Sequence, residues 1–200
     1  MSDPEPIVLA FDTSGSYCAA ALLRGADIID SVCVEMKRGQ AESLFPLLED
    51  ILAKANVNWH DLTRIGVGVG PGNFTGIRIS VASARGLALS LGIPAIGVST
   101  LEVQYSGHPI LASVPAPRDQ CYVQAFGTET MNAKMVTDQE ARELAQSIGV
   151  DIGTALAPIP FVKEIAFRAL RSVSSDPPAP LYVRAADAAP PKDPAPVILP

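Results

Sequence analysis

Asp12, Thr13 and Ser14 are the first residues of the chain whose side chains could do chemistry. They follow Ile7–Phe11, a short apolar run that predicts a buried strand opening into a turn. Side chains at the end of such a strand converge on a cleft when the sheet is open. A carboxylate and two hydroxyls there could hold a hydrated metal ion and a phosphate. The alternative is that Asp12 and Thr13 cap the turn by hydrogen bonding to backbone amides, and the residue types leave both interpretations open.

A glycine-rich loop at Gly70–Gly76 is the second candidate. It follows the β-branched run Arg64–Val69 and precedes Ile77–Leu91, which has helical character and is closed by a glycine. Free amides at a helix start attract anions, and glycines let a ligand approach the backbone closely. The loop lacks the Gly-Lys-Ser/Thr ending of a P-loop and the G-x-G-x-x-G spacing, so a structural turn that packs helix on sheet is an equal alternative. The candidate contacts to a nucleotide or phosphate are Asp12, Thr13, Ser14, Gly70, Gly72, Asn73 and Thr75.

Histidine is too scarce to support most catalytic schemes. His60 and His108 are the two histidines of the sequence, and neither has a partner at metal-ligand spacing. We therefore expect no dedicated metal site. The same scarcity removes most Ser-His-Asp and Cys-His arrangements, so no residue is predicted to be catalytic.

Three cysteines, Cys18, Cys33 and Cys121, form an odd set without C-x-x-C spacing. This pattern fits neither a disulfide framework nor a zinc site, and we expect free thiols. If Arg24–Asp27 forms a tight turn centred between its two middle residues, Cys18 and Cys33 lie opposite each other on paired strands.

The elements that would position these residues begin with a hairpin. Tyr17–Leu23 and Ile28–Val34 predict two strands after the first one. Gln40–Ala55 carries apolar residues at spacings of three and four, which predicts a helix with one buried stripe. Because Pro46 donates no amide hydrogen, it should lie in the first turn of that helix or bend it mildly. Ala95–Val98 predicts a further short strand.

The predicted helix after the glycine loop has a face of small residues. Gly76, Ser80, Ala84, Ala88 and Gly92 recur at every fourth position. Another backbone can therefore come close along this line, either from the same fold or from a partner.

Arg78 and Arg85 lie seven residues apart on the same predicted helix and share a face. Glu42 could reach one of them if this helix packs beside Gln40–Ala55. Otherwise both arginines are solvated charges.

The second half of the chain is less regular. Pro109–Val114 and Gln120–Gly127 predict two strands joined by the turn Pro115–Asp119, and two helical segments follow at Asp138–Ile148 and Phe161–Ser172. We therefore place a lobe boundary near residue 105.

The resulting division has an N-terminal lobe at residues 1–105 that carries the partner-binding helices, a smaller C-terminal lobe at residues 106–188, and a tail at residues 189–200. Eight of the 18 prolines fall within Pro177–Pro200, so the end of the chain cannot be helix or an inner strand. We expect it to run extended and to be disordered beyond Ala188.

Composition excludes several classes of function. A hydrophobic content of 48% over 200 residues suffices for a core. The net charge of -6 argues against a chain that holds nucleic acid by itself, because that needs clustered Lys and Arg. No basic segment with a following apolar stretch opens the chain, and apolar runs end well before about 18 residues. We expect a cytoplasmic protein that does not enter the membrane.

In order and spacing, these motifs resemble the TsaB (YeaZ) family. The similarity is densest at Gly70–Arg78, Gly86–Leu89, Ile93–Pro94 and Gly97–Glu102. Further matches are Leu9–Ser14, Glu42–Pro46 and Pro180–Arg184. Together they cover the first 105 residues densely and the remainder thinly.

The resemblance implies an α/β fold of two actin-like, ribonuclease H-like lobes, as in the ASKHA ATPases. Each lobe would contain a mixed sheet flanked by helices, with the second lobe reduced.

It also implies a non-catalytic scaffold and activator in tRNA modification. In that family TsaB binds TsaD, and TsaE joins as an ATPase in the complex that forms N6-threonylcarbamoyladenosine next to the tRNA anticodon. The tRNA would be reached only through this complex, and TsaB alone tends to form a homodimer on the same helical surface. On this chain, the expected interface residues are Leu44, Leu48, Ile51, Gly76, Ser80, Ala84, Arg85 and Ala88.

No cofactor is expected to be required by this chain, although ATP or ADP and magnesium could lie at the interface of the complex. The main alternative is an active small-molecule kinase or ATPase of the same fold that uses Asp12 and the loop at Gly72–Thr75. A protease is a weaker alternative, because the sequence offers no nucleophile with a base.

Overall fold

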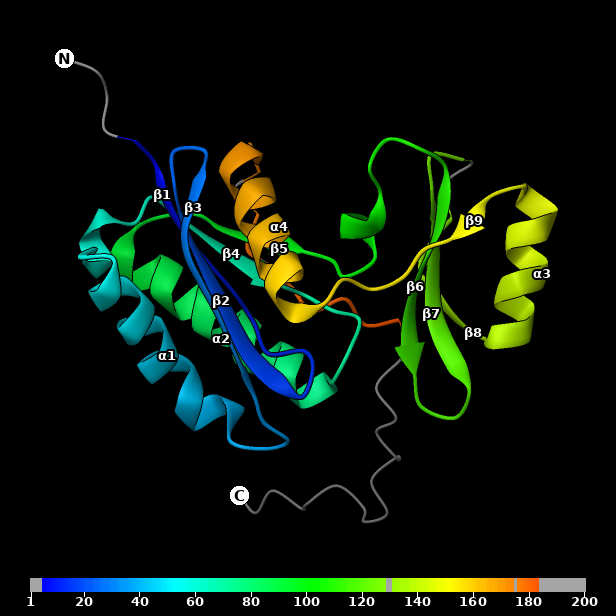
Figure 1. The fold of residues 1–200 in the computed structure, drawn as a ribbon, viewed down its shortest axis with the longest axis horizontal. Coiled ribbons are helices and arrows are strands. Elements are labelled where there is room, and N and C mark those ends of the chain that lie inside the picture. Colours follow the sequence, from blue (N-terminus) through cyan, green and yellow to red (C-terminus); the bar gives the residue numbers. More distant parts are fainter. Residues whose placement is uncertain (1–4, 129–130, 175, 184–200) are drawn as a thin grey trace, which may run out of the picture.

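The computed structural model describes residues 5–128, 131–174 and 176–183. It consists of two lobes, each built on one sheet, that lie side by side (Figure 1). The elements of the first half are β1 (Ile7–Asp12), β2 (Tyr17–Arg24), β3 (Asp27–Glu35), α1 (Gln40–Lys54), the 3₁₀ helix η1 (Trp59–Asp61), β4 (Arg64–Gly68), α2 (Phe74–Leu91) and β5 (Ala95–Val98). Those of the second half are the 3₁₀ helix η2 (Glu102–Gln104), β6 (Ile110–Ala116), β7 (Gln120–Phe126), β8 (Lys134–Thr137), α3 (Asp138–Ile148), β9 (Asp151–Ile152) and α4 (Pro158–Arg171).

The first sheet has the strand order β3-β2-β1-β4-β5. β1 to β3 are antiparallel neighbours, whereas β1, β4 and β5 run parallel. This mixed sheet with helical connections confirms the predicted α/β class with mixed sheets flanked by helices. Because β1 and β4 are parallel, their carboxyl ends at Asp12 and Gly68 lie at one edge of the sheet, and the glycine loop follows β4 there.

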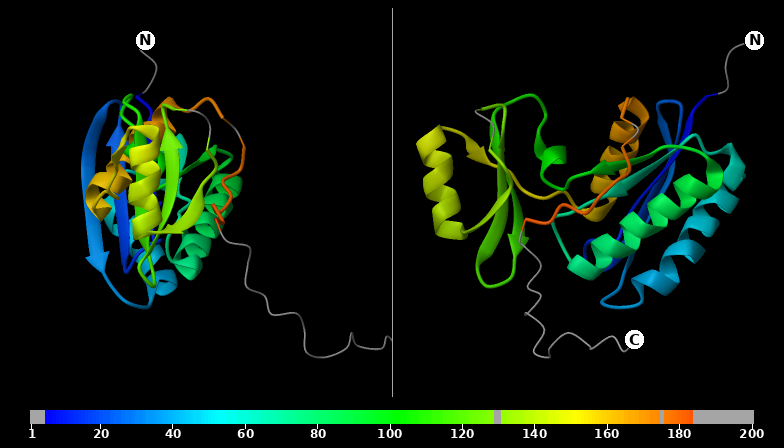
Figure 2. Two further views of the ribbon diagram at one scale, coloured as in Figure 1. Left: turned by 90° about the vertical axis from the view of Figure 1, so that its right-hand side faces the viewer. Right: turned by 180° about the vertical axis from the view of Figure 1, so that it is seen from behind.

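Helices cover both faces of the first sheet (Figure 2). α1 and α2 pack on one face against residues such as Leu9, Phe11 and Leu22, and α4 packs on the other against Val8 and Ala10. Successive side chains of a strand point to opposite faces, so the nearly continuous apolar sequence of β1 supplies both cores.

The helix α4 belongs to the first lobe in space. Its residues lie within the predicted C-terminal lobe of residues 106–188, yet they contact β1, β2 and β4. Gly66 of β4 makes this approach possible, since a Cβ there would lie 2.8 Å from Cγ2 of Ile165. The second sheet is thus an insertion between β5 and α4.

The second lobe is smaller, as predicted. Its sheet has the order β8-β7-β6-β9, with α3 packed against β7, β8 and β9. β6, β7 and α3 were predicted from the sequence, whereas β8 and β9 were not, because they have only four and two residues and are too short for a periodicity to show. The predicted tail at residues 189–200 lies outside the described residues.

The predicted pairing of Cys18 with Cys33 was wrong. The hairpin has the predicted turn, but a bulge between Leu22 and Leu23 shifts the register, so that Cys33 pairs with Ala19. A shift of one residue turns a side chain to the other face, and Cys18 therefore packs on the α1 side while Cys33 packs on the α4 side. All three cysteines are free.

Pro46 lies inside α1 and not in its first turn, because the helix already begins at Gln40. No described helix is both long enough and apolar enough to span a membrane.

Candidate functional site

Asp12 lies at the carboxyl end of β1 and is completely buried. Its Oδ2 atom accepts three hydrogen bonds, from the Ser14 amide at 3.2 Å, from the Ser14 hydroxyl at 2.8 Å and from the Tyr17 hydroxyl at 2.6 Å. Its Oδ1 atom has no hydrogen-bond partner among the described residues. A Cβ added to Gly68 would overlap this oxygen, so Oδ1 lies against the β4 backbone.

Burial dominates the electrostatics of this carboxyl. Removal from water raises the pKa of Asp12, and the hydrogen bonds from Tyr17 and Ser14 oppose that rise only in part. The pKa of Tyr17 is also raised, by its own burial first and then by the neighbouring Asp12. No cation within the described residues is paired with Asp12, since both ion pairs of the structure lie elsewhere.

The glycine loop is closed against the residues that follow β1. The Asn73 amide donates to the Ser14 carbonyl at 2.7 Å, and the Thr13 hydroxyl donates to the Gly76 carbonyl at 2.7 Å. Gly72 lies so close to Ser14 that a Cβ added to it would be 2.7 Å from the Ser14 carbonyl oxygen. A Cβ added to Gly76 would overlap the carbonyl oxygen of Thr13. The predicted nucleotide-site residues therefore lie close together in the structure. Residues 13–14 and 72–76 pack directly against one another there.

The start of α2 is already capped by the chain itself. The Asn73 side chain accepts from the Gly76 amide at 2.8 Å, and the Ile77 amide donates to the Asn73 carbonyl. This is the usual N-cap arrangement. Of the predicted contacts, Asn73 and Thr75 are exposed, while Asp12, Thr13, Ser14 and Gly70 are buried.

Most of the predicted interface residues lie inside the chain's own core. Leu44, Leu48 and Ile51 point from α1 to the sheet, and each has at most 1% of its surface exposed. Gly76, Ser80 and Ala84 are buried where α2 meets the sheet, and the Ser80 hydroxyl donates to carbonyls that include Gly68 of β4. The small-residue face thus allows close approach within the fold, which corrects the expectation that these six residues face a partner. Arg85 is exposed and Ala88 is half-buried.

Other residues of α1 and α2 form an outer surface that the sequence analysis did not identify. We call it the α1–α2 face; it comprises Glu42, Phe45, Glu49, Phe74, Arg78, Arg85 and Leu89, all exposed. Its apolar members are Phe45, Phe74 and Leu89, exposed to 41%, 44% and 87%. The signal that could have found Phe45 is its place outside the buried stripe of the helix.

A groove of about 450 Å³ continues this face at the end of α2. It is lined by Arg85, Gly86, Ala88 and Leu89 of α2, by Ile93–Ala95, and by Pro177 and Pro178. The lining is mostly apolar, which suits a protein surface better than a charged small molecule.

Within the described part of the chain, no group of three or more His, Cys, Asp or Glu side chains is arranged to hold a metal ion.

Comparison with known proteins identifies the family to which the chain belongs. The family model described as "TsaD: tRNA N6-adenosine threonylcarbamoyltransferase" matches residues 33–166. A Buchnera aphidicola (Schizaphis graminum) protein named "tRNA threonylcarbamoyladenosine biosynthesis protein TsaB" is 36% identical over 129 residues, which are 61% of this chain and 60% of that protein. The Escherichia coli protein of the same name is 36% identical over 101 residues, 50% of this chain and 43% of that protein.

The solved structure of YeaZ from Pseudomonas aeruginosa shares the fold, with a TM-score of 0.68 and 24% identity over 88% of this chain and 99% of that one. The matched segment spans 60% of the Buchnera relative and 43% of the Escherichia coli relative. The family model covers most of the chain, and the chain therefore belongs to the TsaD family, within which it groups with the TsaB (YeaZ) proteins.

Proposed function

We propose that this chain is a non-catalytic scaffold and activator subunit that binds a TsaD protein through the α1–α2 face. The complex would form N6-threonylcarbamoyladenosine next to the tRNA anticodon, with TsaE as a further member. Similarity to proteins named for threonylcarbamoyladenosine biosynthesis supports the pathway. The observation that carries the scaffold role is that α1 and α2 expose Phe45, Phe74 and Leu89 among charged side chains, while the chain's best candidate for chemistry is buried.

The charges of the α1–α2 face are separated between its two helices. Glu42 and Glu49 lie seven residues apart on α1, and Arg78 and Arg85 lie seven apart on α2. Seven residues are close to two helical turns, so each pair shares one side of its helix. Each pair therefore forms one strip of like charge, acidic on α1 and basic on α2, and a partner of complementary charge would be held in one register.

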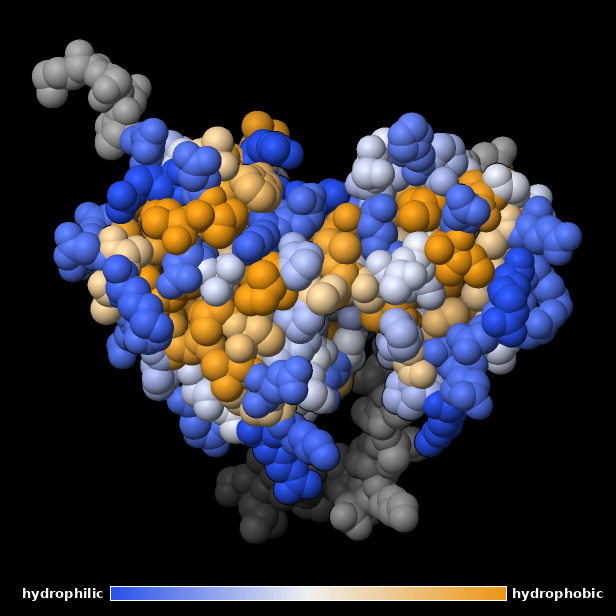
Figure 3. All heavy atoms as spheres, viewed as in Figure 1, coloured by the Kyte–Doolittle hydropathy of each residue, from blue (hydrophilic) through white to orange (hydrophobic). Residues whose placement is uncertain are grey.

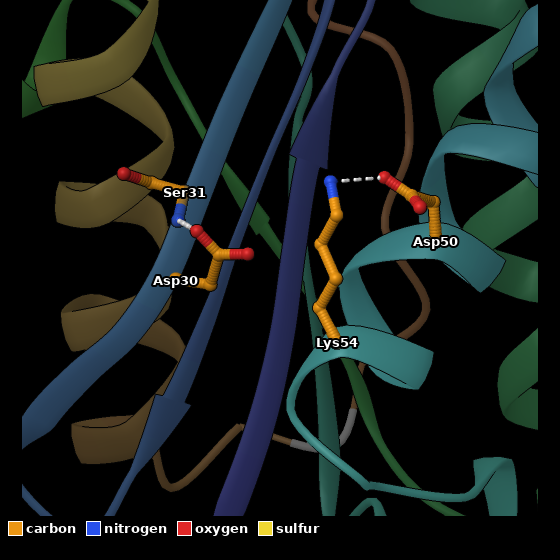
Figure 4. A network of polar contacts seen from close by, with 4 residues as sticks. All are labelled: Asp30, Ser31, Asp50 and Lys54. Atoms are coloured by element: carbon orange, nitrogen blue, oxygen red, sulfur yellow. Dashed lines mark hydrogen bonds and ion pairs between the residues drawn. The ribbon is translucent and has the colours of Figure 1, made fainter.

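Lys54 does not neutralise the acidic strip, because it is already engaged. Its Nζ atom lies 2.6 Å from Oδ2 of Asp50 one turn earlier on α1, as Figure 4 shows, and Asp30 of β3 adds a weaker attraction. Glu42 and Glu49 have no hydrogen bond or ion pair within the described residues.

The basic strip is held differently at its two ends. The Arg78 guanidinium lies 3.8 Å from the centre of the Phe74 ring, and its Nε donates to the Tyr182 hydroxyl at 2.9 Å. Arg85 has no such contact among the described residues. Arg85 is therefore the arginine that is free to pair with a partner's carboxylate.

The same separation of charge suits a second copy of the chain. A two-fold axis would place the acidic α1 of one copy against the basic α2 of the other. We propose that the isolated chain uses the α1–α2 face to form a homodimer, which TsaD binding would replace.

Apolar side chains are also visible in Figure 3 between α1 and the outer strands, where β3 exposes Ile29 and Val34.

The test is co-purification with the TsaD protein of the same organism. The wild-type chain should be retained by tagged TsaD, and Arg85→Glu should weaken binding at least about tenfold, which corresponds to about 1.4 kcal/mol. Arg142→Glu, on the exposed surface of α3, is the matched control and should bind as the wild type does. Equal retention of both variants would show that the α1–α2 face is not the contact.

The tRNA would be reached through the partner, in keeping with the net charge of -6. ATP or ADP and magnesium, if needed, would act at the interface of the complex, and the isolated chain should show negligible ATP turnover. High turnover that is lost on Asp12→Ala would favour the small-molecule kinase or ATPase alternative.

A further inference from the structure

Tyr17 covers the position where the fold would expose a strand-end carboxylate. Its hydroxyl lies 2.6 Å from Oδ2 of Asp12. Its ring lies directly over Gly15, since a Cβ at that glycine would overlap Cε1 of the ring and would be 2.8 Å from Cδ1. The turn after β1 is thus closed from one side by the aromatic side chain of Tyr17, which is the first residue of β2.

The glycine loop closes the same turn from the other side. Its Asn73 amide is bonded to the Ser14 carbonyl, and its Gly76 amide is bonded to the Asn73 side chain. The amides of Asn73, Gly76 and Ile77 are therefore used within the chain. Thr13 and Ser14, with 0% and 7% of their surface exposed, fill the space beneath the loop.

A hydrated magnesium ion does not fit this arrangement. Magnesium binds oxygen atoms at about 2.0–2.1 Å and keeps several of its water molecules, so a ligating carboxylate needs open space in front of it. Oδ2 of Asp12 is surrounded by three donors, and Oδ1 lies against Gly68 without access to solvent.

We propose that Tyr17 closes the space in front of Asp12 at the carboxyl end of β1, which we call the crevice, with its phenol group taking the position that a hydrated metal ion would need there. The isolated chain then does not take up a magnesium nucleotide at the end of β1. Replacement of the Tyr17 ring by a methyl group leaves Asp12 facing a water-accessible space and exposes the backbone of Gly15. This inference concerns the crevice alone and does not depend on whether TsaD binds the α1–α2 face.

The experiment is a titration of the purified chain with Mg²⁺ and a fluorescent ATP analogue, followed by anisotropy. The wild-type chain should show no saturable, magnesium-dependent binding. Tyr17→Ala should show saturable, magnesium-dependent binding at least about tenfold tighter than the weakest affinity that the wild-type titration could detect, which corresponds to about 1.4 kcal/mol. That gain should disappear in Tyr17→Ala/Asp12→Asn, because the amide cannot serve as an anionic ligand.

Two further variants separate the causes. Tyr17→Phe removes the hydroxyl but keeps the ring over Gly15, so it should remain unable to bind. Tyr122→Ala removes a partly buried tyrosine from the second lobe and should leave the titration unchanged.

Circular dichroism reports whether each variant is folded. A folded Tyr17→Ala that gains no binding overturns the proposal, as does a gain that survives Asp12→Asn. If Tyr17→Ala does not fold, the wild type and Tyr17→Phe still decide the matter: magnesium-dependent binding by either one overturns the proposal, and its absence from both supports it. None of these results bears on co-purification with TsaD, so the two proposals fail separately.

Discussion

At the scale of single residues, Asp12 is a carboxyl buried without a cation. Burial of a charged carboxylate is costly unless it is paired, and the group responds by holding its proton more tightly. The three donors around Oδ2 reduce this cost but do not remove it, since the pKa of Asp12 remains raised. The residue therefore behaves as a structural acid that fixes the turn after β1.

This leads to a prediction about pH. Because the pKa of Asp12 is higher in the folded state, its proton stabilises the fold at low pH, and that contribution is lost as the pH rises from about 4 through the folded-state pKa. Asp12→Asn has no proton to lose. Its stability relative to the wild type should thus increase with pH over this range.

Urea unfolding at a series of pH values measures the effect. The expected gain has a limiting slope of about 1.4 kcal/mol per pH unit between the unfolded and folded pKa values. Asp151→Asn, an exposed aspartate on β9, is the control. Parallel stability curves for Asp12→Asn and the wild type would contradict a raised pKa.

The sequence could indicate that Asp12, Thr13 and Ser14 lie at a strand end, but not how their side chains are used. The hydrogen bonds of Asp12 depend on Tyr17, which the strand pattern marked as a residue of β2 and nothing more. Whether an aromatic ring at that position points to solvent or folds back over Gly15 is decided by the turn geometry. That geometry is set by packing against the loop of residues 70–76, far away in the sequence.

At the scale of elements, the junction between α2 and the turn after β1 is the tightest contact. Gly76 lies within α2, where glycine is normally less favourable than alanine by roughly 1 kcal/mol. Here, a Cβ would overlap the Thr13 carbonyl oxygen and lie 2.9 Å from its carbonyl carbon. Only glycine fits at this position, because there is no space for a side chain.

Gly76→Ala should therefore destabilise the protein by about 1–3 kcal/mol, because backbone atoms cannot yield to the methyl group. Gly86→Ala is a matched control on the same helix, since no atom lies within 4 Å of its Cβ position. It should stabilise the protein by about 0.5–1 kcal/mol. Thermal unfolding measures both, and equal shifts for the two variants would show that α2 is not held at Gly76.

Element positions were largely predictable, because long periodic segments carry their own signal. α3 has the bounds expected from the sequence, and α2 ends at the expected glycine. The exposed faces of the helices were not predictable in the same way. A small-residue line such as Gly76, Ser80 and Ala84 indicates close approach but does not say to what, and here the neighbour is the chain's own sheet.

At the scale of the whole molecule, Leu181 joins the two lobes. Its amide donates to the Val69 carbonyl at 2.9 Å, and its side chain packs against the apolar clusters of both lobes. Tyr182 next to it contacts Phe74 and Arg78 of α2. The segment around Leu181 therefore ties the second lobe to the α1–α2 side of the first.

Leu181→Ala should loosen this connection and cost about 1–3 kcal/mol, at the low end for a leucine because the side chain is only half-buried. Amide hydrogen exchange should quicken in β6 and β7 more than in β1. Val173→Ala, at a fully exposed position, is the comparison. Unchanged exchange in the second sheet would mean that the lobes are held by other contacts.

The return of α4 to the first sheet shapes how the chain acquires its structure during synthesis. The side of the sheet under α1 and α2 can be covered as soon as the first half has been made, because all of its partners lie nearby in sequence. The opposite side, lined by Val8, Ala10 and Ile96, has to wait for α4 and for the whole inserted sheet that precedes it. The nascent chain therefore presents a bare apolar surface for much of its translation, and this interval is when chaperones would bind it and when aggregation would begin.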